Sequence, residues 1–384
     1  MRVKNVNCEI KEGEGVSPFV GLFRSRLSKL SKILRGPTFN PSPIRSAGER
    51  AEVAGLVASS PRRTKGGHVV FDLEDSSGST AVWSFDGNGH GCPQAPEVLP
   101  DEVIGVVGRR WNGGIAAERI VWPDVYRKPK EGEGKVAIVA DLHVGSQDFH
   151  EGAWRKFTGW LHKNPVDLVI VAGDIVDGVG VFPGQLERLL ITDIYRQYEY
   201  ALEEMLKLIP EGTEVLIVPG NHDMVRPLEP QPPLSDISFI RIVAKGAFHM
   251  GTNPCTVEFG GVRILVYHGK SLDDLVKRGF DYNKPAEMAA RLLKSRHLAP
   301  IWGGETPLAP TQEDEMVIEQ TPDVFVIAHS HVFQTTSYNG VKIVCSGTFQ
   351  GPTNYTERVG IRPSVGTVAL IDLKTMEMRK LCFA

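Results

Sequence analysis

Five short runs of aliphatic residues after residue 135 each end at side chains that can bind a metal ion. The runs are V-A-I-V-A, D-L-V-I-V-A-G, V-L-I-V-P-G, R-I-L-V-Y and V-F-V-I-A, and they lie between residues 136 and 328. Continuous apolar runs are typical of strands that are buried on both faces. The carboxyl ends of parallel strands meet at one edge of a sheet, so one crevice can collect all five following loops.

Helical patterns separate these strands. They are GAWRKFTGWLHK (152–163), the long QLERLLITDIYRQYEYALEEMLKLI (185–209) and KPAEMAARLLKS (284–295). Strands that alternate with helices favour a layered α/β arrangement with the helices outside.

The loops after the strands carry seven nitrogen and oxygen donors. They are Asp141, His143, Asp174, Asn221, His268, His329 and His331. Four imidazoles, two carboxylates and one amide are too many for one tetrahedral ion, but they suit two divalent ions that share a carboxylate. Mixed N/O donors without thiolates favour Mn²⁺, with Fe, Zn and Ni as alternatives. Each motif alone is a weak signal, whereas all five in this order are a strong one.

The preceding part of the chain has a different pattern. Between residues 46 and 126, five short apolar segments recur between turn signals, which is typical of a five-stranded Greek-key barrel of the OB type. Its basic and aromatic side chains would contact phosphates and stack on bases if the barrel binds a single strand. These are Arg62, Arg63, Lys65, Trp83, Arg109, Arg110 and Trp111. A protein-docking barrel with Trp83 in its core is an equally weighted alternative.

Residues 19–36 alternate apolar and basic side chains at helical spacing, and Gly36 and Pro37 end this pattern. We interpret it as a basic amphipathic helix that packs on its own protein or on a partner rather than on DNA. A polar connector at 127–135 follows the barrel. The predicted domains are therefore 1–45 (helix and linker), 46–128 (OB barrel) and 129–384 (metal-binding domain).

Composition excludes several classes of protein. A length of 384 residues favours two or three domains. The net charge of −3, divided into +6 for residues 1–50 and −9 for the rest, argues against a protein that coats nucleic acid by charge alone. The absence of any apolar run near 18 residues and of a secretion signal predicts a cytoplasmic protein without a membrane partner. The five scattered cysteines suit reduced thiols.

The strand-end motifs carry a resemblance. D-L-H (141–143), G-D-I-V-D (173–177), G-N-H-D (220–223), Y-H-G (267–269) and H-S-H (329–331) resemble the five motifs of calcineurin-like metallophosphoesterases. The longer words DLHVGS, GDIVDGVGVFPGQ, RHLAPIWGG and SGTFQG, with an upstream OB barrel, resemble the small subunits of archaeal family D DNA polymerases. The implied fold is an OB barrel followed by a layered β-sandwich flanked by helices. One departure is Ala328, where the family usually has glycine; a methyl group is tolerated unless this position needs a positive φ.

The resemblance implies roles for individual residues. One ion would be held by Asp141, His143, Asp174 and His331, and the other by Asp174, Asn221, His268 and His329, with Asp174 bridging. His222 would donate a proton to the leaving 3′ oxygen or stabilise it, and Asp223 would orient the His222 ring. Asp177 is interpreted as a loop or hydrogen-bonding residue.

The implied function is a Mn²⁺-dependent 3′–5′ exonuclease that proofreads as the small subunit of a family D polymerase. Its partners would be the large catalytic subunit and DNA, with the sliding clamp as a further candidate. One alternative is a catalytically silent scaffold between the large subunit and the replisome, but no ligand is missing, and seven buried polar groups are costly to keep without an ion. Another alternative is a phosphatase or double-strand-break repair nuclease, which explains the OB barrel and the longer words less well.

Overall fold

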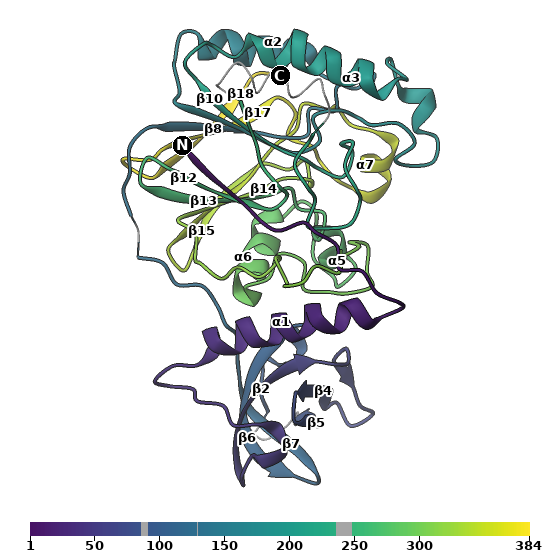
Figure 1. Ribbon diagram of the computed structural model, residues 1–384, viewed down its shortest axis with the longest axis vertical. Coiled ribbons are helices and arrows are strands. Elements are labelled where there is room, and N and C mark those ends of the chain that lie inside the picture. Colours follow the sequence, from purple (N-terminus) through teal and green to yellow (C-terminus); the bar gives the residue numbers. More distant parts are fainter. Residues whose placement is uncertain (86–90, 129, 236–247) are drawn as a thin grey trace. The chain divides into compact units, whose positions relative to one another are not determined.

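The computed structural model describes residues 1–85, 91–128, 130–235 and 248–384, which form two compact units (Figure 1). The sandwich unit contains Met1–Cys8, Tyr126–Ala290 and Thr321–Ala384, and the barrel unit contains Glu9–Val125 and Arg291–Gln320. These borders differ from the predicted ones at three places. The segment with the predicted helix, from residue 9 to residue 45, belongs to the barrel unit and is not separate from it. The first residues of the chain belong to the sandwich unit, and residues 291–320, which sequence placed in the metal-binding domain, belong to the barrel unit.

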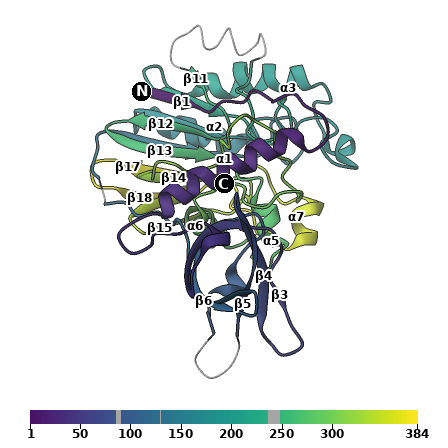
Figure 2. The ribbon, with the colours of Figure 1, turned by 60° about the horizontal axis from the view of Figure 1, so that its bottom comes forward.

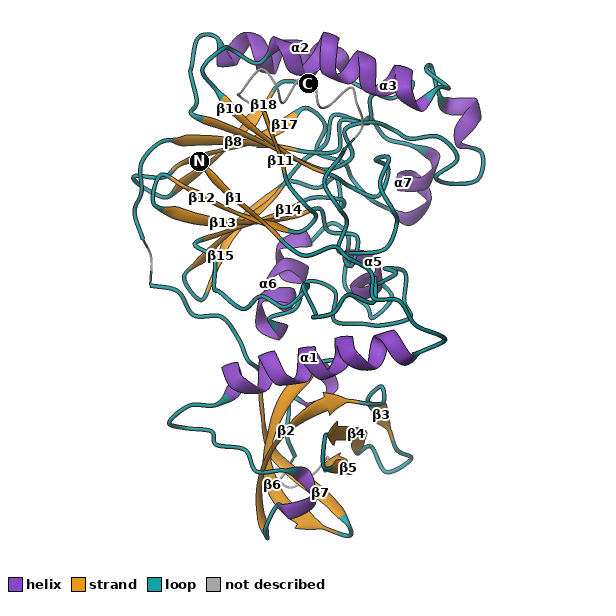
Figure 3. Ribbon diagram, in the orientation of Figure 1, coloured by secondary structure: helices purple, strands orange, loops and turns teal. Residues whose placement is uncertain are grey.

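Two six-stranded sheets face each other in the sandwich unit (Figure 3). One sheet has the strand order β1 (Arg2–Asn5), β12 (Cys255–Phe259), β13 (Val262–Tyr267), β14 (Val324–Ile327), β16 (Val341–Cys345) and β15 (Gln334–Tyr338). The other has the order β11 (Phe248–Met250), β10 (Glu214–Val218), β9 (Leu168–Ala172), β8 (Lys135–Val139), β17 (Thr367–Asp372) and β18 (Glu377–Cys382). Side chains such as Ile138, Ile170, Ile264 and Val326 form a shared apolar core. The five predicted strands lie in these sheets.

Parallel pairing aligns the strands that precede the metal-binding motifs. β8, β9 and β10 are parallel neighbours in one sheet, and β13 and β14 are parallel neighbours in the other. Their carboxyl ends therefore lie at matching edges of the two sheets, where their loops meet.

Helices cover the outer face of the sheet that contains β8 to β10. The helix α2 (Glu151–Leu161) places Trp154 and Phe157 in an apolar cluster with Val169 and Val171 of β9. The continuous helix expected over 185–209 begins only at residue 194, where α3 (Ile194–Tyr200) follows Asp193, whose carboxylate accepts hydrogen bonds from the amides of the first turn. The shorter helices of this unit are α5 (Leu272–Val276) and α7 (Asn354–Val359), and α6 (Pro285–Ser295) spans a unit border.

The barrel unit contains a closed five-stranded barrel (Figure 2). The strand order is β2 (Arg50–Val57), β6 (Val103–Trp111), β7 (Gly114–Val121), β5 (Gly78–Ser84) and β4 (Val69–Asp75), and β4 pairs again with β2. The short β3 (Arg62–Arg63) extends the sheet beside β4. A glycine is needed at Gly108, beside an irregularity in the register of β6, since a Cβ there would lie 2.1 Å from the Ala116 carbonyl oxygen. The predicted architecture, an OB-type barrel followed by a layered α/β sandwich, is confirmed.

The predicted amphipathic helix is α1 (Ser17–Leu34), and it packs on its own unit. Leu30 and Leu34 lie in an apolar cluster with Leu56 and Val107 on the outside of the barrel. One assignment was wrong. Arg26 is one of the basic residues of this amphipathic pattern, which we expected to be exposed, but it is fully buried because its guanidinium contacts Asp314 and backbone carbonyls.

His297, in the R-H-L-A-P word, joins the same buried network. Its Nε2 lies 3.0 Å from Asp314 Oδ2, and Arg26 Nε donates to that oxygen over 2.7 Å. The segment 291–320 is therefore tied to α1 by a buried ion pair with a third polar partner. Among the described residues, every helix is too short or too polar to cross a lipid bilayer.

Candidate metal centre

Every predicted metal ligand lies in a loop that directly follows a strand end of the sandwich. Asp141 follows β8, Asp174 follows β9 and His268 follows β13. Five of the seven ligands have a left-handed backbone, with φ of 51°, 53°, 51°, 66° and 60° at Asp141, His143, Asp174, His329 and His331. Such a conformation costs a residue other than glycine roughly 1–3 kcal/mol, and it persists where surrounding contacts enforce it, which is common at functional sites.

The first donor group consists of Asp141, His143 and His331, whose ligand atoms all lie within 4.8 Å of one another. The Nε2 atoms of the two histidines are 3.2 Å apart, and His331 Nε2 is 3.6 Å from Asp141 Oδ1. All three donors therefore face one point.

The second donor group consists of Asp174, His268 and His329. His268 Nε2 lies 3.3 Å from Asp174 Oδ2 and 3.1 Å from Asn221 Oδ1, which adds the predicted amide oxygen to this group. Asp174 Oδ2 also lies 3.8 Å from His143 Nε2 of the first group. Asp174 thus lies between the two groups, as a bridging carboxylate must.

The burial and the charges of these donors are those expected of a site that binds cations. Asp141 Oδ1 is buried and has no hydrogen-bond partner among the described residues. Burial, with the Asp174 charge nearby, raises the pKa of Asp141 to about 7. Burial opposes protonation of His268, but the Asp174 carboxylate outweighs it and raises the pKa of His268 to about 10. Cations would compensate the clustered carboxylates and occupy the idle oxygen, so the residues present fit divalent ions.

Hydrogen bonds on the other ring nitrogen orient three of the candidate histidine ligands. His143 Nδ1 contacts Asp177 Oδ1 over 3.0 Å, and His268 Nδ1 contacts the Ala172 carbonyl over 3.0 Å. His329 is held by Nε2, which lies 3.0 Å from Asp273 Oδ1. Such partners fix the ring and leave the opposite nitrogen for a metal.

Sequence reasoning missed Asp273, which lies on α5 just after the Y-H-G motif. Burial opposes its ionisation, but His329 and Lys270 outweigh that effect and hold its pKa below the usual range. The Tyr282 hydroxyl also donates to Asp273 Oδ1 over 2.8 Å. The only sequence signal for Asp273 was its position a short distance after His268, and an aspartate at such a spacing is too common to be diagnostic.

Asp177, interpreted from sequence as a hydrogen-bonding residue, has this role in the structure. Besides contacting His143, it accepts hydrogen bonds from Gln185 Nε2 at Oδ2 (2.9 Å) and from Gln350 Nε2 at Oδ1 (3.0 Å). The two glutamines come from the longer words GDIVDGVGVFPGQ and SGTFQG.

His222 forms a third group with His143 and Asp174, in which the possible ligand atoms also lie within 4.8 Å of one another, and one of its nitrogens is already engaged. Its Nδ1 lies 2.7 Å from the Asp177 carbonyl oxygen, so Nδ1 must carry a proton and Nε2 faces away from this bond. The ring packs edge-to-face on His143, with centroids 4.7 Å apart. Burial lowers the pKa of His222, partly opposed by the Asp174 carboxylate.

The role predicted for Asp223 in orienting His222 was wrong. The carboxylate instead accepts hydrogen bonds from the Gly220 amide (2.8 Å), the Ile175 amide (3.2 Å) and the Tyr198 hydroxyl (3.1 Å). Asp223 therefore joins the loop after β10 to the loop after β9. The Asp177 carbonyl contacts the His222 ring instead, because the turn at His222 directs the Asp223 side chain into the protein.

Ala328 leaves the strand-end geometry intact. It is fully buried and is not among the residues with positive φ, so its methyl group needs no strained backbone. The left-handed turn begins one residue later, at His329.

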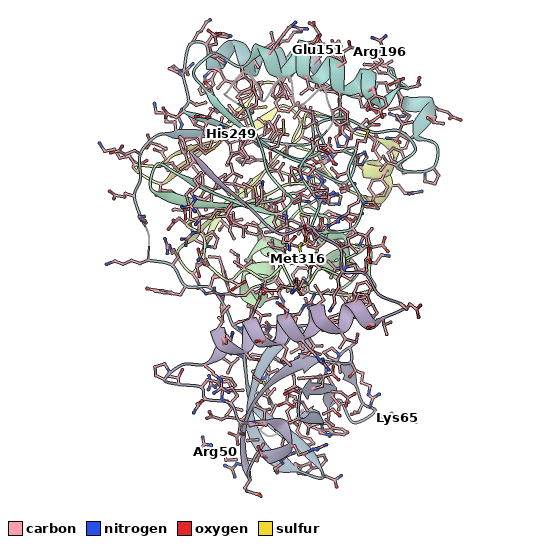
Figure 4. All side chains as sticks on the ribbon, in the orientation of Figure 1. Arg50, Lys65, Glu151, Arg196, His249 and Met316 are labelled. Atoms are coloured by element: carbon pink, nitrogen blue, oxygen red, sulfur yellow. The ribbon has the colours of Figure 1, made fainter. Side chains whose placement is uncertain are left out.

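The predicted DNA-contacting residues all lie in the barrel unit, but they divide into two kinds. Arg62 and Arg63 are exposed on β3, and Lys65 is exposed beside it (Figure 4). Arg109 is exposed next to Glu118. Arg110 is instead tied to the Ile44 and Ala47 carbonyls by its guanidinium.

Trp83 and Trp111 lie in an aromatic cluster on the barrel. Trp83 stacks parallel to Phe85 and contacts Trp111 edge-to-face at 5.6 Å. Sequence reasoning did not include Phe85. Trp83 alternates with the inward-facing Val82 and Ser84 and is only half-buried, which contradicts the alternative that it belongs to the barrel core.

The similar solved structures are distant. The structure of an archaeal phosphodiesterase is 15% identical to this chain, with a TM-score of 0.35, and the match covers 64% of this chain and 98% of that chain. A phosphoesterase from E. coli is 14% identical, with a TM-score of 0.31, and covers 65% of this chain and 100% of its own.

Sequence comparison is more informative. Residues 136–335 match the family of the B subunits of DNA polymerases alpha and epsilon. The DNA polymerase II small subunit of Archaeoglobus fulgidus is 39% identical over 390 residues, covering 96% of this chain and 78% of that protein. The subunit of the same name from Methanothermobacter thermautotrophicus is 34% identical over 391 residues, covering 97% and 80%. The chain therefore belongs to the family of archaeal DNA polymerase II small subunits, which are the small subunits of family D DNA polymerases.

Proposed function

We propose that this small subunit is a divalent-metal-dependent 3′–5′ exodeoxyribonuclease that removes misincorporated nucleotides for the large catalytic subunit. The observation that carries the proposal is the convergence of seven donors on two adjacent points, with Asp174 between them. A fold that used these loops only as a scaffold would gain nothing from burying an unpartnered carboxylate oxygen at Asp141.

The residues divide into two ligand sets. Asp141, His143, Asp174 and His331 would hold one ion, and Asp174, Asn221, His268 and His329 the other. The mixed N/O donors favour Mn²⁺, with Fe, Zn and Ni as alternatives. Bound there, two ions supply positive charge to a phosphodiester and lower the pKa of a water molecule.

In this proposal, His222 is the residue that exchanges a proton with the substrate. Its Nδ1–H is committed to the Asp177 carbonyl, so Nε2 is the atom at which a proton is taken up or released. Hydrolysis from a 3′ end breaks the bond between phosphorus and the 3′ oxygen of the preceding nucleotide, and that oxygen leaves with a proton. Burial lowers the pKa of His222, and the carboxylates of Asp174 and Asp177, which favour the protonated ring, oppose this shift in part.

The direct test uses the small subunit co-purified with its large subunit. We expect about two divalent ions per small subunit and Mn²⁺-stimulated shortening of a 5′-labelled primer with a 3′ mismatch. EDTA should abolish the shortening. A complex that forms but contains no ions in this subunit and shortens no primer would instead identify a catalytically silent scaffold.

The exposed aromatic face of the barrel gives a second proposal, that single-stranded DNA stacks there. Trp111 is 42% exposed and contacts Trp83 and Phe85, and the exposed basic residues Arg62 and Arg63 lie on β3 of the same barrel. Aromatic rings with nearby cations bind single strands by stacking and by charge.

We expect Trp111→Ala to weaken oligothymidine binding by roughly 5- to 150-fold, since stacking is worth about 1–3 kcal/mol per base. Fluorescence anisotropy of a labelled oligonucleotide measures the change. Trp302→Ala is a matched control, because Trp302 is also 42% exposed in the barrel unit but contacts Phe19 and Phe23 of α1. Equal effects of the two substitutions would contradict a stacking role for this face.

A further inference from the structure

The loop between Asp177 and α3 presents several apolar side chains to solvent. Val179, Val181, Phe182, Leu186 and Leu190 are all exposed. From Gly178 to Leu186 the loop contains no charged residue. Exposed apolar side chains gathered in one segment mark a surface that contacts a ligand, and the lack of charge argues against a phosphate as that ligand.

The backbone of this loop is held firmly. Gln185 Nε2 donates to the Asp177 carbonyl (2.6 Å), and Gln185 Oε1 accepts from the Val181 amide (2.8 Å). Gln197, from α3, closes the base of the loop by bonding the Gly178 amide and carbonyl over 2.9 and 3.0 Å. The two buried glutamines supply hydrogen-bond partners for the backbone of the turn, so the apolar side chains that point outward are attached to a rigid backbone.

This rigid backbone is connected to the metal centre. Asp177, to which Gln185 bonds, also orients His143 and His222. A Cβ on Gly178 would lie 2.6 Å from the His222 carbonyl oxygen, so the loop and the His222 turn are in direct contact. The Phe182 ring lies 6.1 Å from the His222 ring, with the planes inclined by 61°. Phe182 is 39% exposed, so part of this ring stays open to solvent beside the residue that would serve the leaving oxygen.

We propose that Phe182, with Val181 beside it, binds the nucleobase of the 3′-terminal nucleotide. This rests on the proposed exonuclease function and adds its substrate class, which is an unpaired DNA end. A base can lie on the Phe182 ring only after it has left its partner and its stack. Unstacking costs least for a mismatched end, so binding at Phe182 favours removal of mismatched over matched nucleotides. Stacking on an aromatic ring does not depend on base identity, which suits an enzyme that must remove any of the four bases.

The test uses the complex with the large subunit and two 5′-labelled single strands that differ only in whether the 3′-terminal residue carries a base or is abasic. The wild-type complex should remove the base-bearing residue faster. Phe182→Ala should lower kcat/KM for that strand by roughly 5- to 150-fold and leave the abasic strand unchanged, so the two rates converge. Phe182→Tyr should retain the preference.

Leu190→Ala is the matched control, because it removes an exposed apolar side chain from the same loop, and its kinetics should equal those of the wild type. Equal removal of both strands by the wild type, or an equal loss on both in Phe182→Ala, would overturn the assignment while leaving the exonuclease in place. Loss of association with the large subunit in Phe182→Ala would also overturn it and identify a protein contact. If the wild type removes neither terminal residue, both proposals fail.

Discussion

Replacing His222 by alanine is expected to lower the exonuclease kcat by roughly 10²- to 10⁴-fold while both metal ions stay bound. The substitution removes Nε2, the only atom of this side chain free to exchange a proton with the substrate, because Nδ1 is engaged with the Asp177 carbonyl. The predicted ligands keep their own partners, since Asp177 still bonds His143 and Ala172 still bonds His268. Primer shortening measures the rate, and elemental analysis of the purified complex measures the ions.

His162→Ala supplies a control for this prediction. His162 is an exposed residue at the end of α2 and has no part in the donor groups, so its loss should change neither rate nor metal content. A His222→Ala complex that loses ions together with activity would show that His222 is a ligand. A complex that retains activity would exclude it from the chemistry.

The positions of the candidate metal ligands were predictable because each depends on a local signal. A run such as V-F-V-I-A can be buried on both faces only inside a layered sheet, and polar residues that follow it must lie at the sheet edge. His329 and His331 follow this rule. The left-handed backbone of both residues was not predictable, since it arises from contacts such as the bond from the His329 amide to Asp141.

Contacts between distant segments were beyond sequence reasoning. Asp273 contacts and orients His329, which lies 56 residues later in the chain. Asp314 accepts a hydrogen bond from the buried Arg26, which lies 288 residues earlier. Neither pair has a spacing that distinguishes it from exposed charges. Asp223 shows the opposite error, because its position next to His222 suggested a contact, whereas the turn sends its carboxylate to the Gly220 and Ile175 amides. Residues next to each other in sequence need not contact each other, because the conformation of the turn that contains them sets the direction of each side chain.

Asp174→Asn is expected to abolish binding of both ions, whereas Asp141→Asn should weaken only one. Asp174 Oδ2 lies between His268 Nε2 at 3.3 Å and His143 Nε2 at 3.8 Å, so it serves both donor groups, while Asp141 belongs to the first group alone. Asparagine has nearly the same shape, and its oxygen can still accept the bond from the His222 amide, so the loop should keep its fold. Elemental analysis should give about two ions per chain in the wild type, fewer in Asp141→Asn and none in Asp174→Asn.

The same metal binding should weaken as the pH falls, and most steeply below about 7, because the ligands bind ions only when they are deprotonated. Without ions, the pKa of Asp141 is about 7 and that of His268 about 10. An ion must therefore displace a proton from His268 across the neutral range, and one from Asp141 as well at lower pH. Proton release on titration with Mn²⁺, measured by calorimetry in buffers of different ionisation enthalpy, should increase from pH 8 to pH 6. Asp141→Asn should remove the part of this increase that belongs to the carboxyl group, and an unchanged proton release in that variant would exclude Asp141 as a ligand.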